Sequence, residues 1–173
     1  MRDLAPTQIH VIVIMGVSGA GKTVVGKALS AATGWPFYEG DDYHSAASVE
    51  KMRHGIPLDD DDRRPWLNAL HQLIADVLRR SERAIIACSA LKAAYRTRLA
   101  EGTAPGAVRF VHLDVPMDVL CARLETRVGH FMPPELLASQ LDTLEAPRDA
   151  LWVDGTKPPA EIVARIRHEL GIP

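Results

Sequence analysis

The most constraining feature of the sequence is an apolar segment that runs directly into a glycine-rich loop. Residues 9–15 read Ile-His-Val-Ile-Val-Ile-Met, a β-branched and almost continuously apolar stretch. This composition is typical of a central parallel strand that is covered on both faces. Residues 16–23 then read Gly-Val-Ser-Gly-Ala-Gly-Lys-Thr, and a helix is predicted over residues 22–32, ended by Gly34. Strand, glycine-rich loop and helix in this order predict an α/β fold.

The rest of the chain alternates between strand-like and helix-like segments. A helix is predicted from Trp66 to Val77, because apolar side chains recur there at helical spacing. The aspartates of residues 59–62 and Pro65 are predicted to begin this helix. Further strands are predicted at residues 35–38, 84–88, 108–113 and 151–153, and further helices at residues 91–100, 119–127 and 160–170. This alternation predicts a single domain over residues 1–173, with a parallel sheet of about five strands and helices on both faces. Ligands bind such sheets beyond the carboxyl ends of the strands.

The glycine-rich loop matches the pattern GxxxxGK[ST] in full. Its glycines allow a tight turn that aims successive N–H groups at phosphates, and the following helix contributes its positive N-terminal end. Lys22 can reach the β- and γ-phosphates, and the Thr23 hydroxyl can bind Mg²⁺. A chance match is the alternative, but the motif lies between a strand and a helix, as a phosphate-binding loop requires. We therefore predict that ATP and Mg²⁺ are cofactors and that the nucleotide is bound by Gly16, Val17, Ser18, Gly19, Ala20, Gly21, Lys22 and Thr23.

Two observations narrow the class of nucleotide-binding protein. GTPases read guanine with an Asn-Lys-x-Asp motif, whereas the only asparagine here, Asn68, is followed by Ala69 inside a predicted helix. The chain of 173 residues is also short for an ATPase motor. A kinase that phosphorylates a small molecule is the class that remains.

Composition excludes several other partners. The formal net charge is −2, which argues against nucleic acid because binding to phosphate backbones needs a basic excess. The two cysteines form no CxxC pair, so neither a disulfide framework nor a zinc knuckle is predicted. The apolar residues 9–15 are too few to span a membrane. We expect a cytoplasmic enzyme with no membrane partner.

An acidic loop follows the predicted second strand and reads Glu39-Gly-Asp41-Asp42-Tyr43-His44. Carboxylates beyond a strand end, facing the phosphate loop, suit two tasks in phosphoryl transfer: holding Mg²⁺ through water, and orienting the attacking hydroxyl. A solvated acidic turn is the alternative. The second acidic run, residues 59–62, is better explained as the start of a helix, because aspartate stabilises helix N-termini.

Four segments, the acidic loop among them, carry a resemblance to a known family. They read EGDDYH (residues 39–44), KMRHGIPLDDDDRRPWL (51–67), CSALKAAYR (88–96) and RVGHFMPPELLASQ (127–140). These strings are far more specific than the phosphate loop and closely resemble the gluconokinase family, over residues 11–145. The resemblance implies phosphorylation of gluconate at its 6-hydroxyl with ATP and Mg²⁺.

The resemblance, together with the chemistry of a polyhydroxy acid, suggests roles for individual residues. Asp41 is expected to orient the 6-hydroxyl and accept its proton, and Glu39 to hold Mg²⁺ through water. Cationic and hydrogen-bonding side chains are expected to bind the substrate, namely Lys51, Arg53, Lys92 and Arg96 for charge, and His44, Ser89 and Tyr95 for hydroxyls. Tyr95 or Arg96 could instead only pin their helix to the sheet.

The resemblance also implies a helical lid over residues 123–140. Arg123 and Arg127 would neutralise charge on the transferred phosphoryl group, and His130 lies within the lid string. A local ion pair of Arg123 with Glu125 or Asp118 is the alternative. Arg63, Pro65 and Trp66 are expected to fix the packing of their helix.

One position departs from the family, and several alternatives stay open. The family commonly has asparagine where this chain has Ser48, so a contact made there by an amide would be lost or bridged by water.

Another hydroxy acid, such as shikimate, could be the acceptor, or the chain could be a non-catalytic ATP-binding sensor. The resemblance implies a homodimer, although no heptad pattern or apolar patch indicates one.

Overall fold

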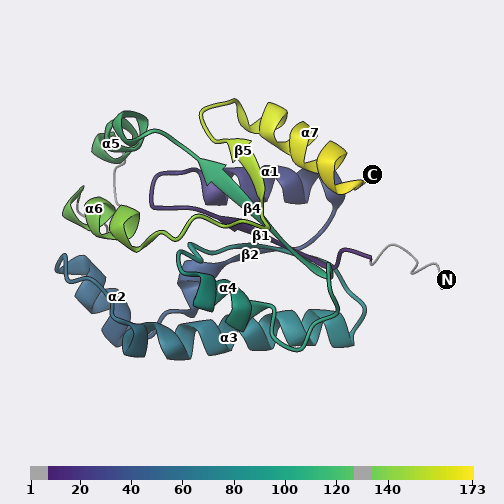
Figure 1. Cartoon of the computed structure of the whole chain (residues 1–173), viewed down its shortest axis with the longest axis horizontal. Coiled ribbons are helices and arrows are strands. Elements are labelled where there is room, and N and C mark those ends of the chain that lie inside the picture. Colours follow the sequence, from purple (N-terminus) through teal and green to yellow (C-terminus); the bar gives the residue numbers. More distant parts are fainter. Residues whose placement is uncertain (1–7, 127–133) are drawn as a thin grey trace.

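A computed structural model describes residues 8–126 and 134–173 of the chain (Figure 1). Its centre is a five-stranded sheet in the order β2-β3-β1-β4-β5, in which every neighbouring pair is parallel. The strands are β1 (Val11–Met15), β2 (Phe37–Glu39), β3 (Ala84–Ala87), β4 (Val108–Asp114) and β5 (Leu151–Asp154). The predicted parallel α/β sheet is therefore confirmed.

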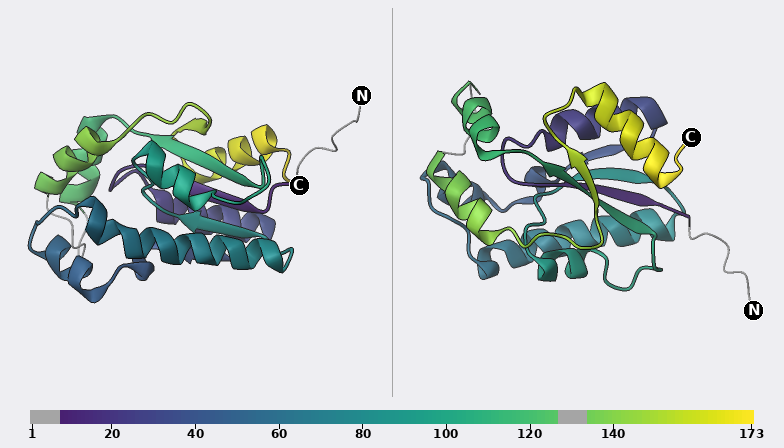
Figure 2. Two further views of the ribbon diagram at one scale, coloured as in Figure 1. Left: turned by 60° about the horizontal axis from the view of Figure 1, so that its bottom comes forward. Right: turned by 45° about the horizontal axis from the view of Figure 1, so that its top comes forward.

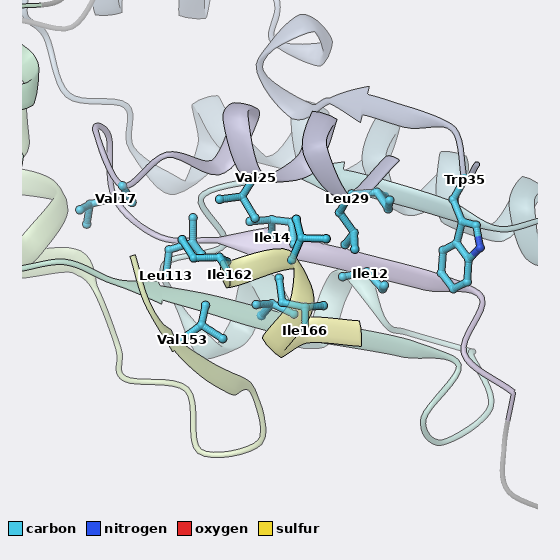
Figure 3. Packing of buried hydrophobic residues seen from close by; sticks show 14 of the residues in the cluster. Ile12, Ile14, Val17, Val25, Leu29, Trp35, Leu113, Val153, Ile162 and Ile166 are labelled. Atoms are coloured by element: carbon cyan, nitrogen blue, oxygen red, sulfur yellow. The ribbon is translucent and has the colours of Figure 1, made fainter. Parts of the chain in front are cut away.

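The central strand β1 explains why the sheet is covered on both faces. All five of its side chains are buried, and they alternate between two hydrophobic clusters. Ile12 and Ile14 pack against α1 and α7, as Figure 3 shows, whereas Val11, Val13 and Met15 face α3 and α4. The covering helices are α1 (Lys22–Thr33) and α7 (Pro159–Leu170) on one face, and α3 (Asp60–Arg79) and α4 (Ala93–Leu99) on the other.

The remaining helices gather at the end of the molecule where the strands have their carboxyl ends (Figure 2). They are a 3₁₀ turn, η1 (Gly40–Tyr43), and the helices α2 (Ala46–Arg53), α5 (Met117–Glu125) and α6 (Pro134–Thr143). The sequence did not predict η1 or α2. Helix α2 buries only Ser48 and has no apolar stripe, so periodicity gives no signal for it. The predicted lid corresponds to the end of α5 and to α6, and residues 127–133 lie outside the described residues.

Close packing at Gly40 fixes the acidic loop against the sheet. A Cβ atom at this position would lie 2.2 Å from the carbonyl oxygen of Ala87, the last residue of β3. The indole Nε1 of Trp66, on α3, donates a hydrogen bond of 2.7 Å to the Gly40 carbonyl. These two contacts hold the start of η1, and with it Glu39 and Asp41, beside the end of β3.

None of the helices in the described part of the chain combines the length and apolar character that crossing a bilayer requires.

Replacing Gly40 with alanine should be costly, because the new methyl group meets backbone that cannot move aside without disturbing β3. We expect Gly40→Ala to lower the free energy of unfolding by about 2 to 3 kcal/mol in urea titrations. Gly102→Ala is the control, since its Cβ would meet nothing within 4 Å and only the left-handed backbone (φ 73°) is strained, at about 1 kcal/mol. Equal losses in the two variants would contradict the packing argument.

Candidate functional site

The phosphate loop has the backbone conformation that an anion cradle needs. Gly16, Gly19 and Gly21 have φ values of 142°, 81° and 99°, which are strained for residues with a side chain. Helix α1 then begins with no acidic residue in its first turn and no side-chain cap. Its first N–H groups are therefore left for a ligand, and the helix dipole favours a negatively charged one.

Two oxygen-bearing side chains meet beside this loop. The Thr23 hydroxyl donates a 2.6 Å hydrogen bond to the Glu39 carboxylate, joining the start of α1 to the end of β2. A hydroxyl and a carboxylate are suitable ligands for a hard divalent cation. Within residues 8–126 and 134–173, no cluster of three or more His, Cys, Asp or Glu could hold a metal. Such a cation would therefore depend on phosphate and water oxygens for most of its ligands, as Mg²⁺ does in nucleotide sites.

A cavity of about 320 Å³ opens at the carboxyl edge of the sheet, and the phosphate loop forms one of its walls. The predicted residues that line it are Ser18, Gly19, Ala20, Gly21, Lys22, Thr23, Glu39, Asp41, His44, Ser89 and Arg123. The structure therefore brings the phosphate loop and the acidic loop into one cavity, because the strands that they follow, β1 and β2, lie on either side of β3 and end at the same edge of the sheet. Gly16 and Val17 belong to the loop but do not line the cavity. The Gly16 N–H instead donates to the Ser89 carbonyl, at 3.3 Å.

His44 is held in the cavity wall by an aromatic stack. Its ring lies on the Trp66 indole with centroids 4.4 Å apart and an interplanar angle of 12°. The Nε2 atom lies 4.0 Å from the Asp41 carboxylate, and the His44 side chain is only 6% exposed while that of Asp41 is 61% exposed. Burial lowers the pKa of His44, which Arg63 lowers further and Asp41 opposes. A neutral imidazole in this place can hydrogen-bond to a hydroxyl group of a ligand.

None of the four cations predicted to bind the substrate lines the cavity. Lys51 forms an ion pair with Asp62 at 2.7 Å, and Lys92 forms one with Asp60 at 2.8 Å. Arg53, on the exposed side of α2, lies 3.8 Å from the Glu50 carboxylate. The acidic first turn of α3 thus attracts both lysines.

Arg96, the fourth of these cations, is a structural residue in this fold. It is only 8% exposed, and its guanidinium donates to the carbonyls of Ala90 at 2.9 Å, Leu91 at 3.1 Å and Glu145 at 3.0 Å. These bonds fix the loop after β3 and the segment after α6. Of the two interpretations offered by the sequence, the structure favours the one in which Arg96 pins its helix.

Tyr95 also lies outside the cavity lining, within a polar network on α3 and α4. Its hydroxyl donates to the Asp60 carboxylate and accepts a 3.2 Å hydrogen bond from Arg63. Hydrogen bonds from Lys92 and Tyr95 hold the pKa of Asp60 below its usual value. Asp59 and Asp62 form a capping box at the start of the same helix, in agreement with the helix-start interpretation.

Arg123 reaches across to the phosphate loop. Its guanidinium donates to the carbonyls of Gly19 and Ala20, both at 3.2 Å, and to that of Gly155 at 2.8 Å. It therefore joins the phosphate loop to the loop between β5 and α7. Arg127 and His130, the other two predicted lid residues, lie outside the described residues.

Some cavity residues were given no site role from the sequence. Arg63 and Trp66 were expected only to pack α3, yet both line the cavity. From α6, the Gln140 side chain accepts a 2.7 Å hydrogen bond from the Ser18 N–H, and Lys157 lines the cavity from the loop after β5. The only sequence signal for Arg63, Trp66 and Gln140 was their presence in family-like strings, and Lys157 lies beyond these strings.

Ser48, the departure from the family, lies inside α2 and not in the cavity wall. It is 3% exposed, and its hydroxyl lies 3.0 Å from that of Ser45, which caps the helix by accepting from the Ser48 N–H. In this chain the position therefore contributes to the start of α2.

The chain is similar to known proteins in sequence and in fold. A family model described as an AAA domain matches residues 11–150. The chain is 45% identical over 161 residues to the gluconokinase of Gluconobacter oxydans (strain 621H), covering 91% of this chain and 89% of the relative. It is 44% identical over 176 residues to the probable gluconokinase of Xenopus tropicalis, covering 92% and 93%. The crystal structure of a gluconokinase from Sinorhizobium meliloti 1021 matches with a TM-score of 0.83 and 47% identity, covering 94% and 91%. The shared fold and these identities over most of the chain show that it belongs to the gluconokinase family of P-loop kinases.

Proposed function

We propose that the protein transfers the γ-phosphoryl group of ATP to the 6-hydroxyl of D-gluconate, giving ADP and 6-phospho-D-gluconate. The observation that carries this proposal is one cavity lined both by the phosphate loop and by Asp41, His44 and Ser89 from neighbouring strand ends. Donor and acceptor must lie side by side for direct transfer, and membership of the gluconokinase family supports gluconate as the acceptor.

The donor end is formed by the phosphate loop. Its N–H groups and Lys22 would hold the β- and γ-phosphates, and the open N-terminus of α1 would add to this attraction. A P-loop kinase family implies a nucleoside triphosphate and a divalent metal. We propose Mg²⁺ as this metal, held through Thr23 and Glu39, where it would neutralise charge on the phosphates.

The acceptor end depends on Asp41. Its exposed carboxylate would accept the proton of the 6-hydroxyl as that oxygen bonds to the γ-phosphorus, while the bond from phosphorus to the bridging oxygen of ADP breaks. His44, neutral and fixed by its stack on Trp66, would hydrogen-bond to a neighbouring hydroxyl of the acceptor. Ser89, which also lines the cavity, would serve the same purpose.

The lid would complete the site after both substrates bind. Arg123 and Arg127 are proposed to neutralise charge on the transferred group, Arg123 from its place over the phosphate loop. Closure of this segment would keep water from competing with the sugar hydroxyl.

An acceptor panel tests the proposal and separates it from its alternatives. ADP release by the purified protein should be stimulated strongly by D-gluconate, and far less by other aldonates, glucose or shikimate. Stimulation by a different acid alone would overturn gluconate as the substrate while leaving a small-molecule kinase. ATP binding without stimulation by any acceptor would instead identify a nucleotide-binding sensor.

Removing the charge of Asp41 should affect turnover more than nucleotide binding. We expect Asp41→Asn to lower kcat by about 100-fold or more, since an amide cannot accept the hydroxyl proton, with the dissociation constant of ATP nearly unchanged. Asp42→Asn, at the adjacent exposed position, is the matched control and should keep normal kcat. A change confined to the KM of gluconate would show that Asp41 only positions the acceptor.

Replacing Glu39 should change how ADP release depends on the Mg²⁺ concentration. Glu39→Gln keeps an oxygen atom beside Thr23 but loses the negative charge, so the Mg²⁺ concentration for half-maximal ADP release should rise about tenfold. The exposed Glu50→Gln variant controls for the change in net charge. An unchanged magnesium titration in Glu39→Gln would remove Glu39 from the metal site.

A further inference from the structure

We propose that Arg63 binds the carboxylate of the acceptor and thereby makes the enzyme selective for sugar acids over neutral sugars and polyols. This inference rests on the proposed function, because it takes the acceptor to be a hydroxy acid. It assigns to Arg63 the task that the sequence suggested for Lys51, Arg53, Lys92 and Arg96.

The distribution of positive charge around the cavity points to this residue. Of the described residues that line the cavity, four are lysine or arginine, namely Lys22, Arg63, Arg123 and Lys157. Lys22 belongs to the phosphate loop, Arg123 contacts the carbonyls of that loop, and Lys157 follows β5 near Gly155. The acceptor side of the cavity is formed by η1, α2 and α3. Among the described residues of that side, Arg63 is the cation that lines the cavity.

The guanidinium of Arg63 also has unused binding capacity. The structure gives it one hydrogen bond, from Nη1 to the Tyr95 hydroxyl at 3.2 Å, and places it 5.7 Å from the centre of the Tyr95 ring. No carboxylate of residues 8–126 or 134–173 lies within ion-pair distance of it. A guanidinium has five N–H donors in a planar fork, so it can bind a carboxylate with two parallel bonds.

The neighbouring carboxylates are engaged by other groups, which explains why Arg63 forms no ion pair within the described residues. The carboxylate of Asp60 is engaged by Lys92 and by the Tyr95 hydroxyl, and that of Asp62 by Lys51. Arg64, the next residue along α3, is exposed and pairs with Asp61. Tyr95 donates its proton to Asp60, so its oxygen is an acceptor toward Arg63 and orients the guanidinium.

The position of Arg63 suits an extended acid with a hydroxyl at its far end. Arg63, His44 and Asp41 line the same cavity, and Nε2 of His44 lies 4.0 Å from the Asp41 carboxylate. In the proposed complex, a linear acid whose carboxylate binds Arg63 would lie beside His44 with its terminal hydroxyl toward Asp41. Selectivity for acids and the site of phosphorylation would then be set at opposite ends of the same bound molecule.

The test compares D-gluconate with D-glucitol, which has the same carbon chain but a CH₂OH group in place of the carboxylate. For each acceptor, kcat and KM are measured by ADP release with wild type and Arg63→Gln. We expect Arg63→Gln to raise the KM for gluconate by roughly 100-fold and to leave kcat/KM for glucitol within about twofold. The preference for gluconate over glucitol should therefore nearly disappear. Arg63→Lys, which keeps the charge without the fork, should retain part of the preference.

Matched variants separate substrate binding from a structural effect. Arg64→Gln, which removes the adjacent exposed guanidinium, should leave the gluconate preference unchanged. Arg53→Gln should likewise leave it unchanged, because Arg53 lies outside the cavity lining and next to Glu50. An equal loss toward gluconate and glucitol in Arg63→Gln, or loss of the preference in the Arg53 variant instead, would overturn the proposal.

The acceptor panel tests the proposed function, whereas the comparison of an acid with its alcohol tests the role of Arg63, so the two can fail independently. If the acceptor panel identifies another hydroxy acid, the same comparison is made between that acid and its reduced alcohol. The assignment of Arg63 stands if its replacement removes the preference for the acid, and falls if the preference survives.

Discussion

The parallel pairing of β1 between β3 and β4 is the constraint on which the other features depend. Parallel strands need crossovers, and the crossovers cover both faces of the sheet, so β1 must be apolar on both sides. The same pairing places the carboxyl ends of all the strands at one edge. Loops that are far apart in the sequence, after β1, β2 and β3, therefore meet there and form one cavity.

Charge pairing on α3 decides which cations face that cavity. The run of four aspartates at its start stabilises the helix N-terminus and attracts Lys51 and Lys92 from neighbouring helices. These ion pairs are partly exposed to solvent, so each contributes little to stability. Their main effect is on the position of the two lysines, which lie against α3 and do not line the cavity.

Sequence patterns predicted the elements that have a strong period or a specific motif. The apolar strands, the phosphate loop and the amphipathic helices α3 and α7 were all anticipated, because burial on one or both faces leaves a direct trace in residue order. Helix α2 was not anticipated, since it buries almost nothing and is held by the Ser45 cap and by the pairing of Lys51 with Asp62. Among the site residues, Asp41, His44 and Ser89 reach the cavity, whereas Arg96 is turned toward backbone carbonyls.

The sequence by itself determined the fold class, the phosphate loop and the resemblance to the gluconokinase family, because these depend on local order and spacing. Only the tertiary structure decided which polar side chains share the cavity. A side chain such as Arg63 or Arg96 can point to a ligand, a carboxylate or a carbonyl, and residue order is the same in each case. The choice depends on distances between residues that are remote in the sequence, as in the bonds that join Arg96 to Glu145 and Arg123 to Gly155.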